Sequence, residues 1–410
     1  MLKVNAHNIL KKREKQIYYL LMLVIYSVFV IPQQFRMGIL GDGLGTINLI
    51  GSLMLLLLFF LCVSKSNKSI MILAILANIY MLIIGTISGE TNQNIIMSLV
   101  SFTVPLILIA SKIDEKILVV YLEKIIKIIN MLIIFITILG IVNYMEHGKV
   151  MILISTILSN DLRRLIEAQQ MESLIRMYSF MGHPLFNTEI YLIFYSLNMV
   201  YSSYFKKLLN NNIVIVISIV GIALTMSKSG FILLLISLFF IGQKKIKLRY
   251  LVCLMLVIFI LFRIGIFDNI ISRFMEGSLS TGRNEAWEIY NNLGIYHIRF
   301  FVGYGLSSAY YLNNFYPYLV AAFEYPYRMF SFEHGLLITF IIYMCIGAYP
   351  IVKLLKRKHF KVLMAYLIVF VDINTFNGIS LPGDYMLVFC IYTFTLLNIS
   401  DYIYNDIHKS

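Results

Sequence analysis

Apolar runs of about 15 to 20 residues recur along the whole chain, and short polar loops, most of them rich in lysine, separate them. An α-helix needs about 20 such residues to cross a hydrocarbon core of about 30 Å. The runs lack the strict alternation of strands in a membrane β-barrel. Hydrophobic residues make up 60% of the sequence, whereas soluble domains average about 45–50%. The pattern predicts an all-α polytopic integral membrane protein with a single transmembrane domain over residues 1–410.

The lysine-rich loops predict how the chain crosses the membrane, because cytoplasmic loops carry an excess of lysine and arginine. The run 213–242 is divided at Ser227–Gly230, since Lys206-Lys207 before it and Lys244-Lys245 after it both favour the cytoplasm. We therefore expect about twelve transmembrane helices with both termini cytoplasmic. The expected helices are 17–32, 47–63, 70–87, 95–110, 125–142, 190–205, the two halves of 213–242, 250–267, 336–352, 362–379 and 384–399.

Two long polar segments fall on the outer side in this topology. Residues 143–189 form the first outer insert, in which the short apolar stretch Met151–Leu158 predicts an interfacial helix. Residues 268–335 form a large extracytoplasmic loop between the ninth and tenth helices. It contains Trp287, which is the single tryptophan of the chain. We interpret it as a catalytic loop.

The two kinds of cation are distributed differently. In this topology 20 of the 22 lysines lie in inner segments, whereas nine of the twelve arginines lie in outer segments or at outer helix ends. The lysine excess explains the net charge of +13, so the charge does not indicate a nucleic-acid partner. Guanidinium groups bind phosphate with two parallel hydrogen bonds. The outer arginines therefore suggest an anionic ligand such as a diphosphate, with anionic lipid headgroups as the alternative.

The sequence has no pattern of a metal or disulfide site. All four cysteines lie inside apolar runs, without the spacing of ligands or disulfide pairs. No outer loop carries a paired-aspartate motif. We expect chemistry without a metal and without a cofactor. The first apolar run follows a basic stretch and lacks a cleavage site, so it is expected to stay as an anchor.

Two short segments outside the large loop carry candidate site residues. Arg176 and His183 precede the sixth expected helix, and His183 is a possible proton acceptor. An ordinary helix-entry turn is the alternative for this segment. Lys228 lies at the tip of the hairpin within 213–242, where a charge in apolar surroundings needs a partner or water. Snorkelling of Lys228 to the interface is the alternative there.

The large loop carries most of the remaining candidates. Arg283 offers a fork of donors, and Glu324 and Glu333 offer carboxylates that could act as general bases. Trp287 offers a flat face for a sugar or for the membrane interface. We also assign substrate binding to four further residues: Arg273, Arg299, Arg328 and His334. Outside the loop, Asp372 is an intramembrane acid in the eleventh expected helix, which would suit a proton-coupled transporter.

Four ordered patterns carry a family resemblance. They are Arg176 followed by Gly182-His183-Pro184, the hairpin sequence Leu224–Gly230, Ser280-Thr281-Gly282-Arg283 followed by Trp287, and Gly303-x-Gly305 followed by Glu333-His334-Gly335. In this order the sequence resembles the O-antigen ligase and polymerase family, the Wzy-type bacterial polysaccharide polymerases. The resemblance covers roughly residues 170–350. Lys228 occupies a position where the family has arginine.

The resemblance implies an activity and a partner. The substrate would be an oligosaccharide repeat on undecaprenyl diphosphate, transferred on the outer face of the bacterial inner membrane to the next lipid-linked repeat. Arg176 and Arg283 would hold the diphosphate, and Glu324, Glu333 or His183 would accept the proton of the sugar hydroxyl. A flippase and a chain-length regulator are possible partners, and the product would be a capsule, an exopolysaccharide or an O-antigen.

Two alternatives stay open at this point. The ligase branch of the family carries a histidine where this chain has Glu324-Tyr325-Pro326, which favours a polymerase over a ligase that attaches glycan to another carrier. A flippase or transporter of lipid-linked sugars is suggested by Asp372 and the number of expected helices. Transporters usually contain internal repeats, and none is visible here.

Overall fold

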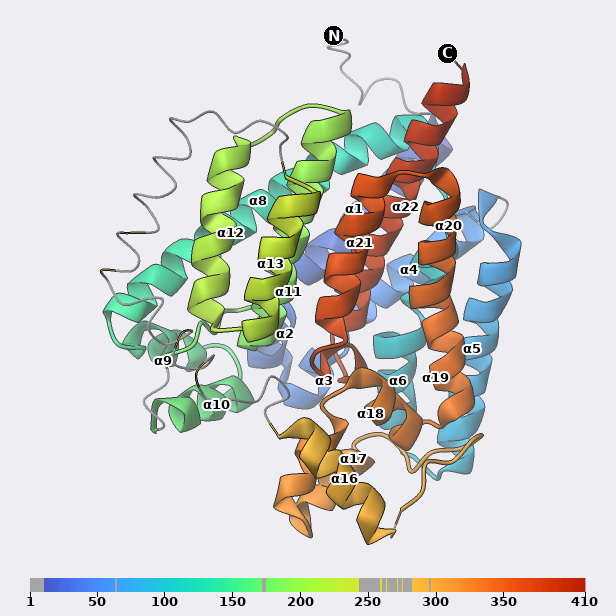
Figure 1. Cartoon of the computed structure of the whole chain (residues 1–410). Coiled ribbons are helices and arrows are strands. Elements are labelled where there is room, and N and C mark those ends of the chain that lie inside the picture. Colours follow the sequence, from blue (N-terminus) through green and yellow to red (C-terminus); the bar gives the residue numbers. More distant parts are fainter. Residues whose placement is uncertain are drawn as a thin grey trace.

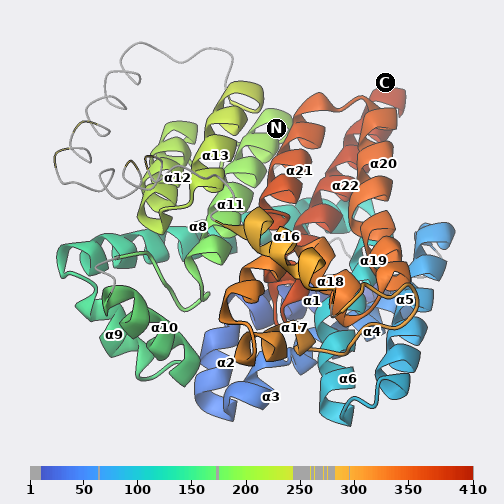
Figure 2. The same cartoon turned by 60° about the horizontal axis from the view of Figure 1, so that its bottom comes forward.

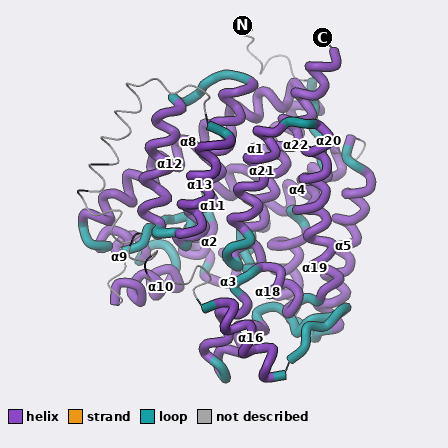
Figure 3. The backbone as a smooth tube through the Cα atoms, viewed as in Figure 1, coloured by secondary structure: helices purple, strands orange, loops and turns teal. Residues whose placement is uncertain are grey.

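A computed structural model describes residues 11–62, 65–171, 175–242, 282–294 and 296–409, together with the single positions 259, 263, 271 and 275. Within these ranges the regular elements are helices, and the only strand-like feature is an isolated bridge between Ser179 and Gly182 (Figure 3). The expectation of an all-α fold is therefore confirmed for the described part of the chain.

The helices follow one another with short connections (Figure 1). Those of the first half are α1 (Lys12–Phe29), α2 (Gln33–Leu40), α3 (Asp42–Thr46), α4 (Leu49–Cys62), α5 (Lys68–Ile87), α6 (Asn92–Ser98), η3 (Leu99–Thr103), α7 (Leu106–Ala110), α8 (Glu115–Met145), α9 (Lys149–Ser155), α10 (Asn160–Met171) and α11 (Pro184–Tyr204). Those of the second half are α12 (Asn211–Thr225), α13 (Lys228–Phe240), α16 (Arg283–Leu293), α17 (Ser308–Tyr311), η4 (Leu312–Asn314), η5 (Pro317–Phe323), α18 (Pro326–Glu333), α19 (Leu336–Tyr343), η6 (Met344–Ala348), α20 (Tyr349–Arg357), α21 (Phe360–Ile373), η7 (Gly378–Ser380) and α22 (Tyr385–Lys409).

Several of these helices are long and apolar enough to cross a membrane. In the described part of the chain there are six, and a seventh if α1 and α2, which meet at 75°, form one broken span. The six are Asp42–Cys62, Lys68–Ile87, Asn92–Ala110, Glu115–Met145, Leu336–Arg357 and Tyr385–Asp406. Each corresponds to one helix expected from the sequence. The protein is thus a multi-pass helical protein by length and composition.

The remaining expected helices are shorter or more polar. The expected helix 190–205 is α11, which has 21 residues but carries several polar side chains. The run 213–242 does divide at its Ser-Lys-Ser-Gly segment, into α12 with 15 residues and α13 with 13. The expected helix 362–379 is α21, with 14 residues, and 250–267 lies outside the described residues. The count of twelve stays a prediction.

The loops expected inside and outside gather at opposite ends of the bundle. At one end Arg13 donates to the main-chain oxygen of Leu61 over 2.7 Å. At the same end Lys65 pairs with Asp114 at 2.5 Å, and Asp401, near the end of α22, pairs with Lys353 at 2.9 Å. The start of α1 and the end of α22 therefore share this lysine-rich end (Figure 1).

The first outer insert contains one helix more than expected. The interfacial helix expected at 151–158 is α9, and α10 follows it and packs against it. The insert is also shorter than expected, because α11 begins at Pro184. The Nδ1 atom of His183 accepts the main-chain N–H of Leu185 over 3.2 Å, and proline is favoured at the first helical position.

The large loop folds on its own small core. Tyr290, Phe323, Met329 and Phe332 are buried together between α16, η5 and α18. Figure 2 shows α16 and α18 lying across one end of the bundle, with α9 and α10 to one side of it. Part of the loop, from 268 to 281 apart from two single positions, lies outside the described residues.

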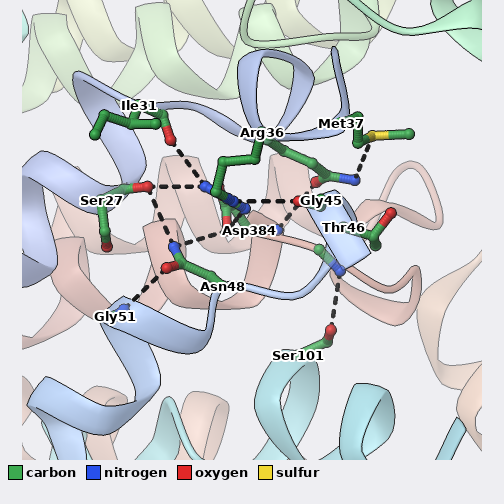
Figure 4. Close-up of polar contacts among 12 residues, drawn as sticks. Ser27, Ile31, Arg36, Met37, Gly45, Thr46, Asn48, Gly51, Ser101 and Asp384 are labelled. Carbon is green, nitrogen blue, oxygen red and sulfur yellow. Dashed lines mark hydrogen bonds and ion pairs between the residues drawn. The ribbon is translucent and has the colours of Figure 1, made fainter. Parts of the chain in front are cut away.

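A buried ion pair fixes α2 and α3 to the start of α22 (Figure 4). Arg36 Nη2 lies 2.8 Å from Asp384 Oδ1, and both side chains are buried. The same guanidinium donates to the main-chain oxygens of Ser27, Ile31 and Gly45 at 2.8, 2.9 and 3.2 Å. Buried charges are tolerated when they are paired and hydrogen-bonded in this way.

Candidate functional site

Arg283 is the first residue of α16 and is held by two groups from other segments. Its Nε atom is paired with the carboxylate of Glu324, and its Nη1 atom donates to the main-chain oxygen of Thr375 over 2.6 Å. Gly282, with φ of 83°, precedes it in the left-handed region that glycine favours. The Arg283 side chain is only 14% exposed, so its orientation is fixed by these contacts.

Arg176 lies along the end of α12. Its Nε atom donates to the main-chain oxygen of Thr225 over 3.2 Å. The next residue, Met177, continues the contact, because its N–H donates to the oxygen of Leu224 over 3.0 Å. The segment expected to enter the sixth helix is thus attached to the hairpin tip between α12 and α13.

Lys228 is the first residue of α13, at that hairpin tip. The turn is formed by Met226, whose φ is 55°, and by Ser227, whose Oγ accepts the N–H of Gly230 over 3.1 Å. Such a serine cap satisfies a helix N–H that would otherwise lack a partner. Lys228 is half-buried, and no described carboxylate lies within ion-pair distance of its ammonium group.

Thr375 connects the hairpin tip to the large loop. Its hydroxyl lies 3.3 Å from that of Ser229, and its main-chain oxygen accepts from Arg283. A chain of contacts therefore runs from Arg176 through the hairpin tip and Thr375 to Arg283. The three cations Arg176, Lys228 and Arg283 come from three separate segments, which these contacts join at one end of the bundle.

No family model, curated protein or solved structure matches this chain. The resemblance to Wzy-type polymerases therefore rests on the sequence motifs. What the cation cluster does has to be argued from its own chemistry.

Three residues are expected candidates for the general base. Glu324 lies in the cluster through its ion pair with Arg283, and its side chain is 37% exposed. His183 accepts from Leu185 with Nδ1, so its other nitrogen carries the proton. Burial, with a contribution from Arg176, lowers the pKa of His183 to about 3. His183 is therefore neutral at physiological pH, and the lone pair of its Nδ1 atom already accepts the N–H of Leu185. This favours Glu324 over His183 as the general base.

Glu333 lies elsewhere, at the end of α18. It is buried, and its Oε1 atom accepts the N–H of Ala309 over 3.4 Å. Burial raises the pKa of Glu333 to about 8, although amide N–H groups of residues 307 and 309 oppose the shift. Close by, Glu90 accepts the N–H of Leu306 over 2.8 Å. A carboxyl that is mostly protonated at pH 7 is a poor proton acceptor, so this environment favours a structural role for Glu333.

The predicted substrate-binding residues of the loop lie mainly in its packing. Arg328 is buried, with its guanidinium 4.5 Å from the centre of the Trp287 ring, and it donates to Asn284 Oδ1 over 3.2 Å. His334 is buried against Phe102, and burial lowers the pKa of His334 to about 4. Arg328 also donates to the main-chain oxygen of Arg283 over 3.4 Å, which supports the position of Arg283.

Arg299 and Arg273 are not part of the described cluster. Arg299 is exposed, and its guanidinium stacks 4.1 Å from the ring centre of Tyr304. Arg273 lies outside the described residues. The sequence did not indicate the roles of Thr225 and Thr375, whose main-chain oxygens accept from Arg176 and Arg283. A main-chain oxygen is present at every residue, so neither position had a signal in the sequence.

Chemically, the cluster can bind a ligand that carries two or more negative charges. Arg283 is held through its Nε and Nη1 atoms, which leaves Nη2 to donate to a ligand, and Arg176 and Lys228 add two further positive charges. Fixed donors of this kind stabilise charge that develops on a leaving group. Glu324 adds a carboxylate at the same place, where it could accept a proton.

Proposed function

We propose that the protein polymerises oligosaccharide repeats carried on undecaprenyl diphosphate, on the outer face of the bacterial inner membrane. The observation that carries the proposal is the gathering of Arg176, Lys228 and Arg283, linked through Thr225 and Thr375, at the end opposite the lysine-rich loops. A lipid-linked diphosphate is an anion that reaches such a cluster from the membrane. The product would be a capsule, an exopolysaccharide or an O-antigen.

The reaction follows from the residues at the cluster. A hydroxyl oxygen of the acceptor sugar forms a bond to the anomeric carbon of the donor glycan. The bond between that carbon and the diphosphate oxygen breaks, and the lipid diphosphate leaves with the electron pair. Glu324 accepts the hydroxyl proton, and Arg176, Lys228 and Arg283 stabilise the leaving charge. A flippase that supplies the repeats and a chain-length regulator are the partners this reaction implies.

The proposal is tested in a strain that lacks the protein and is complemented by variants. Arg283→Ala and Arg176→Ala should each abolish long surface polysaccharide at matched protein levels. Arg163→Ala is the control, because Arg163 is exposed on α10 and, among the described residues, forms an ion pair only with Glu167, one turn away. Normal chain lengths in both cluster variants would refute the proposal.

Transfer of finished glycan to another carrier is a close alternative, since a ligase needs the same anion site. The two activities leave different intermediates in the deletion strain. A missing polymerase leaves single lipid-linked repeats on the outer leaflet. A missing ligase leaves intact lipid-linked polymer, and finding that polymer would overturn the polymerase in favour of the ligase.

Transport of lipid-linked sugars is favoured by a different observation. Glu189 on α11 and Asp372 on α21 are both buried, on two helices that pack against each other. Among the described residues neither oxygen of Glu189 has a hydrogen-bond partner. Buried acids within a helical bundle are common in proton-coupled transporters. Repeats that accumulate on the inner leaflet of the deletion strain would support transport and refute the polymerase.

A further inference from the structure

A second cation-rich feature lies at the opposite end of the bundle from Arg283. A cavity of about 520 Å³ is formed there by the segment before α5, the junction of α7 and α8, the helix α20 and the end of α22. Its charged lining consists of Lys65, Lys112, Lys353, Lys356, Arg357 and Asp401. The volume is within the range of about 300–1,000 Å³ that is usual for small-molecule sites.

The charges around this cavity are not balanced. Asp401 is buried and is shared by three cations, at 2.9 Å from Lys353, 3.3 Å from Arg357 and 3.8 Å from Lys112. Lys65 pairs with Asp114, which lies beside the cavity. Among the described residues Lys356 forms no ion pair. Five cations thus face two carboxylates. Lys356 is exposed, and the side chains of Lys65 and Lys112 are 48% and 45% exposed, so these cations are accessible to a ligand, and their excess positive charge attracts an anion.

The surroundings of the cavity suit the headgroup of a membrane lipid. Val352 lines the cavity and is 48% exposed, and Leu355 one turn further along α20 is 55% exposed. Ile72 on α5 follows the cavity-lining residue Asn67 in the chain and is 56% exposed. Acyl chains could lie on these apolar side chains while a phosphate enters the cavity. The N-terminus of the 20-residue helix α5 also begins here, and its partial positive charge favours an anion.

We propose that this cavity binds a phosphate-bearing ligand, and that the phosphate belongs to an anionic membrane lipid. Basic pockets between transmembrane helices on the cytoplasmic side are suited to such headgroups. The proposal is independent of the polymerase reaction, because no residue of the cavity belongs to the Arg283 cluster.

The test compares two double variants with the unchanged protein. Lys112→Gln with Lys356→Gln removes two charges from the cavity while Lys353 and Arg357 still pair with Asp401. Lys207→Gln with Lys361→Gln removes two charges from the same end, outside the cavity. Native mass spectrometry then counts bound dioleoylphosphatidylglycerol, dioleoylphosphatidylcholine or inorganic phosphate, each titrated separately. Thermal unfolding without added ligand shows whether each variant is folded.

We expect phosphatidylglycerol to bind the unchanged protein and the control variant, and to bind the cavity variant about 30-fold more weakly. The factor follows from about fivefold for each lysine near an anionic group. Inorganic phosphate could instead bind with the same difference between the cavity and control variants, while the lipid does not bind. That result would keep the anion site but assign it to a soluble ligand and not to a lipid. Equal weakening in both variants, no binding to the unchanged protein, or equal binding of phosphatidylcholine would overturn the proposal. If the cavity variant fails to fold, the single variant Lys356→Gln replaces it, with an expected weakening of about fivefold.

Discussion

Arg36 and Asp384 form an ion pair of 2.8 Å although 348 residues separate them in the chain. Asn48 also donates to the same Asp384 oxygen, over 3.1 Å. The pair joins α2 and α3 to the start of α22. Of the candidate spans in the described chain, the one formed by α22 is the most completely buried. The end of the bundle that carries α2 and α3 therefore depends on a contact between segments far apart in the sequence.

Arg36→Ala should destabilise the protein strongly, because it leaves the Asp384 carboxylate buried without its partner. Breaking a buried pair in this way costs about 3–5 kcal/mol. The measurement is thermal unfolding of the purified protein in detergent. Arg163→Ala, which removes an exposed pair between neighbouring turns of α10, should cost less than about 1 kcal/mol. Similar losses in the two variants would contradict the importance of the buried pair.

Arg283→Lys should lose nearly as much of the proposed polymerase activity as Arg283→Ala. The guanidinium contacts Glu324 and the Thr375 oxygen at the same time, and the single ammonium of lysine cannot reproduce this planar fork. Loss of a fixed electrostatic donor lowers turnover by about 10²–10³-fold. The measurement is the rate at which purified protein extends lipid-linked repeats. Near-normal rates for Arg283→Lys would show that charge alone matters.

Much of the helical bundle could be predicted because long apolar runs report directly on membrane-length helices. The division of 213–242 at the segment containing Lys228 was predicted for a different reason, since the basic loops on either side required two crossings. The helix α10 was missed. It is short and amphipathic, and it buries little more than Leu162 and Ile166, so no apolar run marks it.

The candidate site could be predicted only in part. Arg176 and Arg283 were expected to hold one diphosphate, and contacts through Thr225, Ser229 and Thr375 join their two segments to the hairpin that carries Lys228. The burial of Arg328 against Trp287 could not be foreseen, because an exposed and a buried arginine look alike in sequence. The same holds for the Arg36–Asp384 pair, whose partners are set by tertiary packing.

The buried carboxyl of Glu333 should contribute a loss of stability as the pH rises from about 5 to 8. Its pKa is raised from 4.5 to about 8 by burial, so the folded state holds the proton more tightly than the unfolded chain. Between these two values the unfolded state binds fewer protons, and stability is lost with rising pH. The slope is at most about 1.4 kcal/mol per pH unit.

Glu333→Gln should remove this slope, because the amide resembles the protonated carboxyl. Thermal unfolding at pH 5.5, 6.5 and 7.5 measures it. Other groups set the slope that remains in this variant. Glu90, whose pKa is also raised by burial, contributes in the same direction. His183 and His334, whose pKa values are lowered by burial, contribute in the opposite direction below about pH 6.5, so the effect of Glu333 is the difference between the variant and the unchanged protein. Glu288→Gln, an exposed position on α16, should keep the full slope. A slope in Glu333→Gln equal to that of the unchanged protein would rule out Glu333 as its source.

Gly230→Ala should destabilise the hairpin tip that presents Lys228. A methyl group at this position would lie 2.2 Å from Thr188 Cγ2 on α11, and the hydroxyl of Thr188 is itself bonded to that of Thr225 over 2.8 Å. Overpacking of this kind costs about 1–3 kcal/mol. Thr188→Ser removes Cγ2 and keeps the hydroxyl, so the double variant should recover most of the loss. Thermal unfolding of the two single variants and the double variant measures this coupling. If the losses of stability in the single variants simply add in the double variant, a clash with Thr188 is not the reason why glycine is needed at position 230.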